Sequence, residues 1–439
     1  MMKKIILSIS LFTSFSALAS YPELFGASYS TSAIGNQSNL DINDPSNNYY
    51  APALLGFSDK VNMLYQVNTV STSFTPIKNI VVTNNTNSSG ETYGDVSNNY
   101  ENFNGGALHF ALPIGYQHIG TLGLSVYMPI GNLMETNSGD PFRPEYVMYQ
   151  SRYQHTSAYL NFAKSFFNDY SLSIGSYLGF QASANVNSNI TLGVGSTYGS
   201  WASARSKISP SLALIASVAK KYDHNKFYFT YQQEMKSNLK AVVSGEIADP
   251  TRFLLNTEIN SMIFYDPHTF RFGFSQNYSD LEIYTGIEYQ LWSNYTPPKI
   301  NIIKTGGVIH SSTNFENLVI RNTFNPRIGL KYSLTHRFDV SAGMCYRMTP
   351  IDGNFSGSGN SIDANTTIFS TGFQYRIVIW SKDVSIGSSF QYQLLEKNHV
   401  VKTALQEDGS AGNKIGAGPN GYDVGGHVIA GSAGIKFNF

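Results

Sequence analysis

The sequence has few charged residues and almost no cysteine. Only 13% of its 439 residues are charged, and 29 basic residues balance 29 acidic ones. A net charge of zero provides no electrostatic footprint for nucleic acid, so we expect no nucleic-acid partner. The single cysteine, Cys345, cannot form an intramolecular disulfide. The fold must therefore be held by backbone pairing and side-chain packing.

Long apolar runs are missing beyond the first twenty residues, which excludes a membrane protein built from helices. At the N-terminus, Lys3 and Lys4 precede an apolar stretch over 5–18, and Ala17-Leu18-Ala19 matches a small-x-small cleavage site. This stretch is too short to span a bilayer as a helix. We therefore expect residues 1–19 to be a cleaved secretory signal peptide.

Catalytic and metal-binding motifs are missing as well. The sequence contains no HExxH, GxSxG or P-loop motif and no His/Cys cluster at metal-ligand spacing. The glycine-rich tract at 409–426 has no following helix that could bind phosphate, and a flexible loop is the simpler interpretation. We expect a protein that is not an enzyme, with no catalytic residues, no cofactor and no metal.

Apolar and polar residues alternate with a period of two along most of the chain, which is typical of strands. In LEIYTGIEYQLW, Ile283 and Ile287 share one face, while Glu282 and Glu288 lie on the other. Such stretches cover 60–74, 106–117, 120–132, 152–167, 170–184, 208–221, 226–243, 254–276, 281–292, 320–335, 337–349, 366–379, 383–396 and 426–439.

The connections between these fourteen stretches alternate between short turns and long loops rich in Asn, Ser, Gly and Pro, such as 185–207. This alternation is typical of outer-membrane barrels, and only a closed sheet leaves no unpaired edge in a bilayer. We predict an all-β fold, a 14-stranded antiparallel transmembrane β-barrel whose walls extend beyond the membrane. A secreted protein of several β-sandwiches is the alternative.

Charged residues on the polar faces of the predicted strands are candidates for the barrel lumen. One interpretation is a basic pocket for a ligand carboxylate, and the other is a lattice of salt bridges that stiffens a filled barrel. The acidic candidates are Glu234, Glu282, Glu288 and Asp339, and Cys345 is interpreted as a small lumen residue. The basic, ligand-binding candidates are Arg327, Lys331, Arg347, Arg376 and Lys436.

Aromatic residues near the predicted strand ends are typical of an interfacial girdle. The candidates are Tyr65, Phe110, Tyr127, Tyr159, Phe227, Tyr289, Tyr332 and Tyr375.

Several collinear segments resemble the FadL/TodX family of outer-membrane transporters for long-chain fatty acids and other hydrophobic compounds. They are AIGNQSNLDINDPSNNYYAPALLGF, LHFALPIGYQHIGTLGLSVYMPIG, NKFYFTYQQEMKSNLKAVVSGEI, LEIYTGIEYQLWSNY, RIGLKYSLTHRFDVSAGMCYRMTPI and the terminal GIKFNF. The resemblance implies an N-terminal hatch inside the lumen, which we place at 20–58, followed by a barrel at 59–439. It also implies release of the ligand sideways, through a gap at a kink of the third strand.

The resemblance singles out two short motifs. Ala51, Pro52 and Ala53 stand where the family has Asn-Pro-Ala, so the Asn side chain that could satisfy a kinked strand is lost. Either Asn48 replaces it or the lateral gap is altered. The kink candidates in the third strand are Gly123, Pro129 and Gly131, although Pro and Gly near a strand end can also mark its termination.

These observations predict passive uptake of hydrophobic compounds, foremost long-chain fatty acids, across the outer membrane of a Gram-negative bacterium. The expected partners are these ligands, outer-membrane lipid and the barrel-assembly machinery, which would recognise the aromatic C-terminus at Phe439. The alternatives are a general diffusion porin for small solutes and an adhesin or phage receptor that acts through its long loops.

Overall fold

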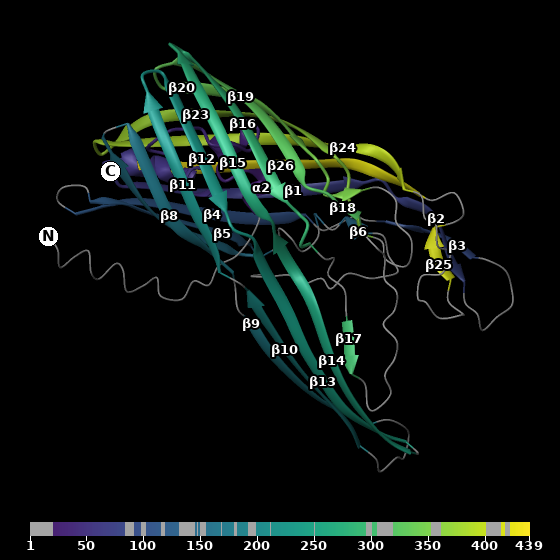
Figure 1. Ribbon diagram of the computed structural model, residues 1–439. Helices are drawn as coiled ribbons and strands as arrows, with labels where there is room; N and C mark the ends of the chain where they lie inside the picture. Colours follow the sequence, from purple (N-terminus) through teal and green to yellow (C-terminus); the bar gives the residue numbers. More distant parts are fainter. Residues whose placement is uncertain are drawn as a thin grey trace.

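Fourteen antiparallel strands close on themselves in the computed structural model (Figure 1). Neighbours in the chain are neighbours in the barrel, and the first and last strands pair with Asn62 opposite Asn438. The predicted architecture and strand number are confirmed. The barrel strands are β1 (Asn62–Phe74), β4 (Phe103–Ile114), β5 (Gly120–Pro129), β7 (Ser157–Phe166), β8 (Tyr170–Leu178), β11 (Ala213–Tyr222), β12 (Asn225–Gln232), β15 (His268–Tyr278), β16 (Leu281–Leu291), β19 (Thr323–Thr335), β20 (Phe338–Arg347), β23 (Thr366–Ile379), β24 (Lys382–Val400) and β26 (Tyr422–Asn438).

The structure describes residues 21–83, 92–97, 102–115, 119–130, 145–146, 148–149, 155–167, 169–179, 182–191, 199–210, 212–249, 251–295, 301–304, 319–352, 361–400, 414–417 and 422–439. The predicted signal peptide lies outside this range. Within the range, no helix is long and apolar enough to cross a bilayer.

Short connections join alternate pairs of strands at one end of the barrel. Asp223, Ser279, Trp380 and Ser381 have positive φ values of 46°, 58°, 48° and 60°, because a two-residue reversal requires left-handed backbone. Both ends of the barrel segment lie at this end, which we call the short-turn end. The opposite end, with the long connections, is the loop end.

The polar face of each barrel strand points into the lumen, as predicted. Along β16, Glu282 and Glu288 are buried while Ile287 and Tyr289 are exposed.

The prediction of an interfacial aromatic girdle is wrong for Tyr127 and Tyr159, which are 1% exposed and face the lumen. Alternate residues of a strand face opposite sides of the sheet, and a single aromatic residue does not show which of the two sides it faces.

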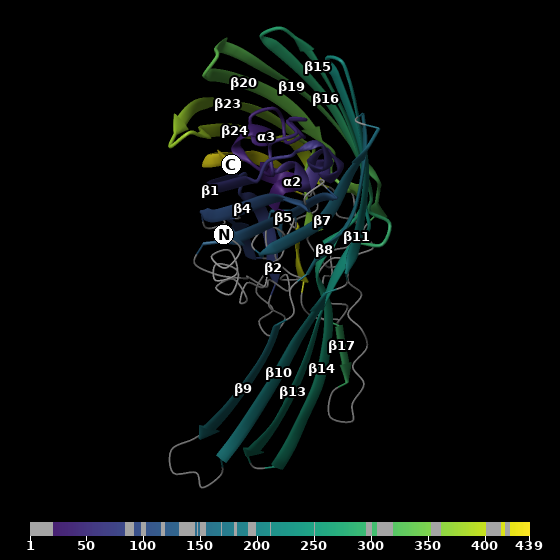
Figure 2. The same ribbon diagram turned by 90° about the vertical axis from the view of Figure 1, so that its left-hand side faces the viewer.

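A second sheet extends the wall beyond the barrel at the loop end (Figure 2). We call it the projecting sheet; its order is β17-β14-β13-β10-β9. The prediction of single strands over 226–243 and 254–276 is wrong, because each is interrupted, the second at Pro267, which has no N–H for a ladder. The prediction of a loop over 185–207 is also wrong, since most of two strands fall within this range. The bounds are β9 (Ala182–Thr191), β10 (Gly199–Pro210), β13 (Met235–Asp249), β14 (Thr251–Asp266) and β17 (Asn301–Lys304).

In the described parts of the long connections, three smaller sheets are present. They are formed by β25 (Lys414–Ala417), β2 (Ile77–Thr83) and β3 (Thr92–Val96), by β22 (Ser361–Ile362) with β6 (Glu145–Tyr146), and by β18 (Val319–Ile320) with β21 (Ile351–Asp352).

The N-terminal segment lies inside the barrel (Figure 2). Its described residues form four short helices. Pro52 begins the last of them, where its fixed φ and missing N–H are tolerated. Over residues 21–57, which we call the hatch, all but five are buried. The exact boundary at residue 58 stays a prediction. The helices are α2 (Tyr21–Phe25), α3 (Tyr29–Ser32), α4 (Asn47–Tyr50) and η1 (Pro52–Phe57).

Candidate functional site

The hatch is fitted closely against the wall at inward-facing glycines. A Cβ on Gly343 of β20 would collide with the backbone of Ile34 and Gly35. The glycine faces that alternate with apolar faces in the sequence therefore have a steric purpose: they let hatch backbone approach the strands.

Asn48 on α4 connects the hatch to two strands of the wall. Its Nδ2 donates to Ser125 Oγ on β5 at 3.1 Å and to the Tyr159 carbonyl on β7 at 3.0 Å. In return, Asn161 Nδ2 on β7 donates to Asn48 Oδ1 at 2.9 Å. A Cβ on Gly123 would collide with the Asn48 amide, so glycine is needed at this point of β5. Asn48 thus bridges the third and fourth barrel strands.

The Ala51-Pro52-Ala53 motif follows this bridge and is fully buried. Its first residue donates its backbone N–H to the Asn47 carbonyl at 2.8 Å, so this motif continues the turn that presents Asn48. Asn48 therefore makes polar contact with the wall, and its predicted role of satisfying a kinked third strand stays a prediction.

The third strand runs through Gly123 with regular pairing on both sides, opposite Ala111 on β4 and Asn161 on β7. Pro129 is the last residue of β5, where a missing N–H ends the ladder, and Gly131 lies outside the described residues. A kink that opens a lateral gap at these positions stays a prediction.

A buried ion cluster lies at the centre of the lumen wall. Arg271 Nε donates to Glu288 at 2.7 Å, and Arg327 donates to the other oxygen of the same carboxylate at 2.9 Å. Arg271 also donates to the Tyr49 hydroxyl at 3.0 Å, and Arg327 to the Asn36 carbonyl at 2.6 Å. Both arginines therefore hold hatch residues, and Arg327 has the contacts of the predicted salt-bridge lattice.

Arg347 lies at the loop end, away from the other predicted cations. Its guanidinium forms two 3.0 Å hydrogen bonds with the carboxylate of Asp363. The same group donates to Thr366 Oγ1 at 3.0 Å and lies 5.4 Å from the ring centroid of Tyr149. Arg347 thereby fastens the segment that precedes β23 over the lumen.

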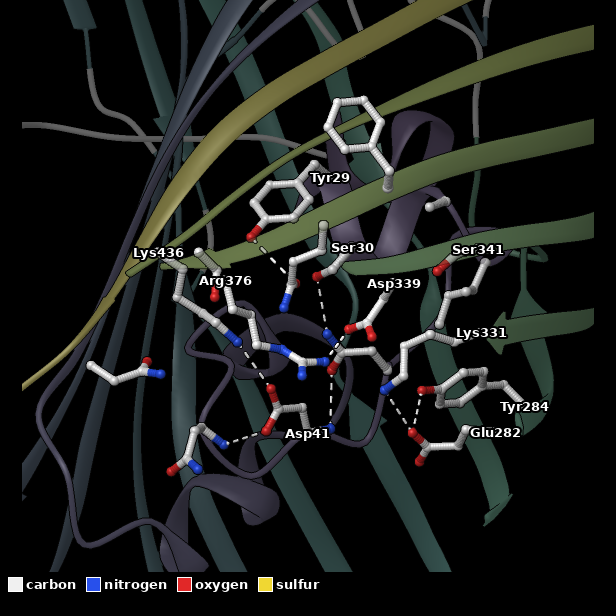
Figure 3. Close-up of a pocket in the computed structure, with 18 of the residues that line it drawn as sticks. Tyr29, Ser30, Asp41, Glu282, Tyr284, Lys331, Asp339, Ser341, Arg376 and Lys436 are labelled. Atoms are coloured by element: carbon white, nitrogen blue, oxygen red, sulfur yellow. Dashed lines mark hydrogen bonds and ion pairs between the residues drawn. The ribbon is translucent and has the colours of Figure 1, made fainter. Parts of the chain in front are cut away.

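A polar cavity of about 310 Å³ lies between the hatch and the wall at the short-turn end (Figure 3). Four basic residues line it, of which Lys331 donates to Glu282 at 2.7 Å and Arg376 pairs with Asp339. Lys226 also lies near Glu282, at 3.6 Å, and the remaining basic residue is Lys436. Four cations against three carboxylates leave one excess positive charge in the cavity.

The third ion pair of this cavity joins the hatch to the last strand. Lys436 Nζ on β26 lies 2.9 Å from Asp41 Oδ2, with the Asp41 side chain 37% exposed. The partial burial of Asp41 works to raise its pKa, but the Lys436 ammonium and the Asn43 backbone amide outweigh this effect. The pKa of Asp41 therefore lies below its ordinary value, and the carboxylate is ionised at neutral pH.

The structure brings together three of the five predicted cations, Lys331, Arg376 and Lys436, whereas Arg327 and Arg347 lie apart. All five have acidic partners, and a ligand-binding role stays a prediction. Glu234 lies between β12 and β13, where it pairs with Lys236 and accepts a hydrogen bond from the Tyr265 hydroxyl, and its place in the lumen stays a prediction.

The sequence-based search missed four residues of these sites: Arg271, Asp41, Asp363 and Lys226. Arg271 carried a usable signal, because it alternates with the outward-facing Phe270 and Phe272. The other three lie in the hatch, in a loop or beside a turn, where no periodicity identifies inward positions.

Aromatic side chains crowd the lumen on the loop side of the hatch. Tyr21 of the hatch lies 5.6 Å from Phe103 of β4 between ring centroids, and Tyr49 lies 5.1 Å from Tyr159. Farther along the wall, the rings of Tyr159 and Tyr177 stack at 4.6 Å. Closely packed, buried aromatic side chains thus lie toward the loop end of the lumen, where the Arg347–Asp363 pair also lies, and the other ion pairs lie at its centre and at the short-turn end.

These features define a class of fold, a fourteen-stranded barrel whose lumen is filled by an N-terminal hatch. Solved structures of two other proteins match the chain in fold. A Pseudomonas aeruginosa FadL homologue is 16% identical, with a TM-score of 0.59. The toluene transporter TodX of P. putida is 13% identical, with a TM-score of 0.51. Each alignment covers 94% of this chain and 98% of the other.

No protein-family model matches the chain, and no curated protein sequence matches it. The resemblance noted in the sequence is thus confirmed at the level of fold.

Proposed function

We propose that this protein resides in the outer membrane of a Gram-negative bacterium and takes up hydrophobic compounds passively. The observation that carries the proposal is the hatch, which is buried inside the barrel and bonded to strands on opposite sides of it. An open diffusion porin would instead need a water-filled lumen. Support also comes from the matched fold, which is that of a FadL homologue and a toluene transporter.

The aromatic loop-end lumen suits a hydrophobic ligand. Each CH2 group moved out of water contributes about 0.8 kcal/mol, so an acyl chain would pass from the external loops into an apolar site in the barrel without an energy source. We therefore propose capture at the loop end. Long-chain fatty acids are the ligand class that we propose, because the lumen also contains cations that could meet a carboxylate.

The short-turn cavity is the place that we propose for that carboxylate. Its volume of about 310 Å³ lies at the low end of the range for small-ligand sites. Arg376 is the cation best placed to exchange partners, because its side chain is 43% exposed while Asp339 is 2% exposed. A fork of N–H donors can grip an incoming carboxylate in bidentate fashion.

This assignment predicts that Arg376→Ala weakens fatty-acid binding roughly tenfold, the effect of losing one charged hydrogen bond. Arg337→Ala, at the exposed turn before β20, is the matched control and should bind normally. Oleate binding to the purified protein, measured by calorimetry, distinguishes the two. Unchanged binding in Arg376→Ala would assign this arginine to the salt-bridge lattice instead.

We propose release of the ligand sideways between β5 and β7. Asn48 bridges these two strands, so a small movement of the hatch would remove three hydrogen bonds between hatch and wall here. An acyl chain gains by moving from the lumen into hydrocarbon, whereas an aqueous exit offers it nothing.

The test is uptake of radiolabelled oleate by cells that lack other fatty-acid transporters. In a Cys345→Ser background, Leu124→Cys with Leu160→Cys places two thiols opposite each other across β5 and β7. Oxidation should block uptake and a reductant should restore it. The control pair, Ile328→Cys with Met344→Cys across β19 and β20, should not affect uptake.

Two negative outcomes have different meanings. Full uptake through the sealed variant would contradict the lateral route and leave the transport function standing. Absence of oleate and toluene uptake by the unmodified protein would contradict the proposed function itself.

We also propose that the barrel-assembly machinery recognises Phe439. Its side chain is 51% exposed after the last strand, and its ring stacks on Phe437 at 6.1 Å. An accessible aromatic end of the closing strand suits recognition before that strand is paired.

A further inference from the structure

The outer face of the barrel carries an apolar groove near the short-turn end. It has a volume of about 570 Å³ and crosses the neighbouring strands β7, β8, β11 and β12. The two flanking strands form its sides with the aromatic side chains of Phe162, Phe166, Phe229 and Tyr231. The two central strands form its floor with the aliphatic side chains of Leu172, Ile174, Ala216 and Val218.

The pairing register explains this shape. Ala216 on β11 pairs with Ile174 on β8 and with Tyr231 on β12, so the smallest side chain of the row lies between larger ones. The next row toward the turn contains Leu172, Val218 and Phe229. The groove therefore runs along the two central strands, in the direction in which a lipid chain would lie against a membrane barrel.

Two lysines lie where the groove approaches the short turns. Lys164 lines the groove, with its ammonium 5.7 Å from the ring centroid of Phe166. Lys220 lies one row closer to the turn, paired with Tyr170, and its ammonium is 4.8 Å from that ring centroid. An apolar slot that ends in two cations is complementary to an amphiphile with an anionic head.

We propose that this groove binds an anionic phospholipid of the leaflet at the short-turn side. One acyl chain lies on the aliphatic floor between the aromatic sides, and the headgroup phosphate pairs with Lys164 and Lys220. The proposal rests on the proposed membrane location. It concerns a lipid of the surrounding bilayer rather than the transported ligand, because the groove is on the outer face.

The test uses the full barrel in nanodiscs of equal phosphatidylglycerol and phosphatidylethanolamine, with retained lipid identified by native mass spectrometry. We expect one phosphatidylglycerol to stay bound. A lysine near a membrane surface contributes roughly fivefold to anionic-lipid affinity, so Lys164→Gln with Lys220→Gln should lower this preference about 25-fold. The control Lys382→Gln, beside the Phe439 ring at another short turn, should keep it.

A second variant tests the groove itself. Ala216→Phe fills the floor while keeping the outer face apolar, so it should release the lipid whatever its headgroup. Equal retention by the unmodified protein and by Ala216→Phe would overturn the proposal, as would retention without preference for the anionic lipid. If the barrel does not insert into bilayers at all, the proposed membrane location fails; if it inserts and takes up oleate without retaining lipid, only the groove assignment fails.

Discussion

At the scale of single residues, the contact between hatch and wall depends on side chains that are missing as well as on those that are present. Gly343 allows the Ile34 backbone to approach β20, and Gly123 allows the Asn48 amide to reach Ser125. Both contacts join residues far apart in the sequence. A change that adds even a small side chain at these points should act on the hatch rather than on the strand.

Gly343→Val should destabilise the seated hatch by about 1–3 kcal/mol, the usual cost of overpacking. The added Cβ would collide with hatch backbone, which cannot turn aside like a flexible side chain. Single-channel recording should then show opening events that the unmodified protein lacks. Ala342→Val, on the exposed outer face of the same strand, is the matched control, and equal conductance in the two variants would contradict the steric role.

The Asp41–Lys436 pair predicts acid sensitivity of the hatch. The pKa of Asp41 is lower in the folded protein than in the unfolded chain, where it is about 4, so the pair stabilises fully above that pH. The contribution is lost as the pH falls further. Conductance recorded in steps from pH 5 down to about pH 2 should show hatch opening only at the acid end of that range, because the stabilisation is lost only as the pH approaches the lowered pKa of Asp41, whereas Asp41→Asn should already open at pH 5. Identical pH profiles would show that another carboxylate controls the hatch.

At the scale of elements, the alternating pattern predicted the barrel strands because a lumen filled with polar groups leaves each strand one polar and one apolar face. The alternating pattern could not separate β12 from β13 or β14 from β15, because the same alternation continues from the barrel into the projecting sheet. The ion pairs of the lumen were beyond sequence reasoning for a similar reason. Asp41 meets Lys436 across almost the whole chain, and periodicity carries no information on such distant partners.

The projecting sheet should be dispensable for folding. Its strands pair with one another, while the barrel pairings β8–β11 and β12–β15 lie outside it. Joining Leu178 to Ala213 and Gln232 to His268 through short turns should leave a barrel with an unchanged heat-modifiable gel shift. Oleate uptake at low ligand concentration should fall if the sheet helps capture. Loss of the folded band would show instead that these hairpins are needed to close the wall.

At the scale of the whole molecule, the hatch is the structural reason to distinguish this barrel from an open pore. It touches β5 and β7 on one side and β19 to β26 on the other, so it connects regions of wall that do not pair with each other. Removing it should change permeability more than any substitution in the wall.

Deleting residues 20–58 should produce a large, steady conductance in planar bilayers, because the polar lumen groups that now bond to the hatch would become hydrated. The variant without the projecting sheet keeps the hatch and should stay closed, which makes it the control. An unchanged conductance after the deletion would contradict the plug role of the hatch.

The pairing of β1 with β26 has a consequence for how the molecule is assembled. Asn62 and Asn438 are opposite each other although nearly the entire barrel sequence separates them, so this ladder can form only when the last strand has been made. The hatch precedes β1 and is therefore available throughout. We expect it to act as an internal template: early strands gather on Asn48, later ones on Ile34 and Asp41, and the seam between β1 and β26 closes around a core that is already in place.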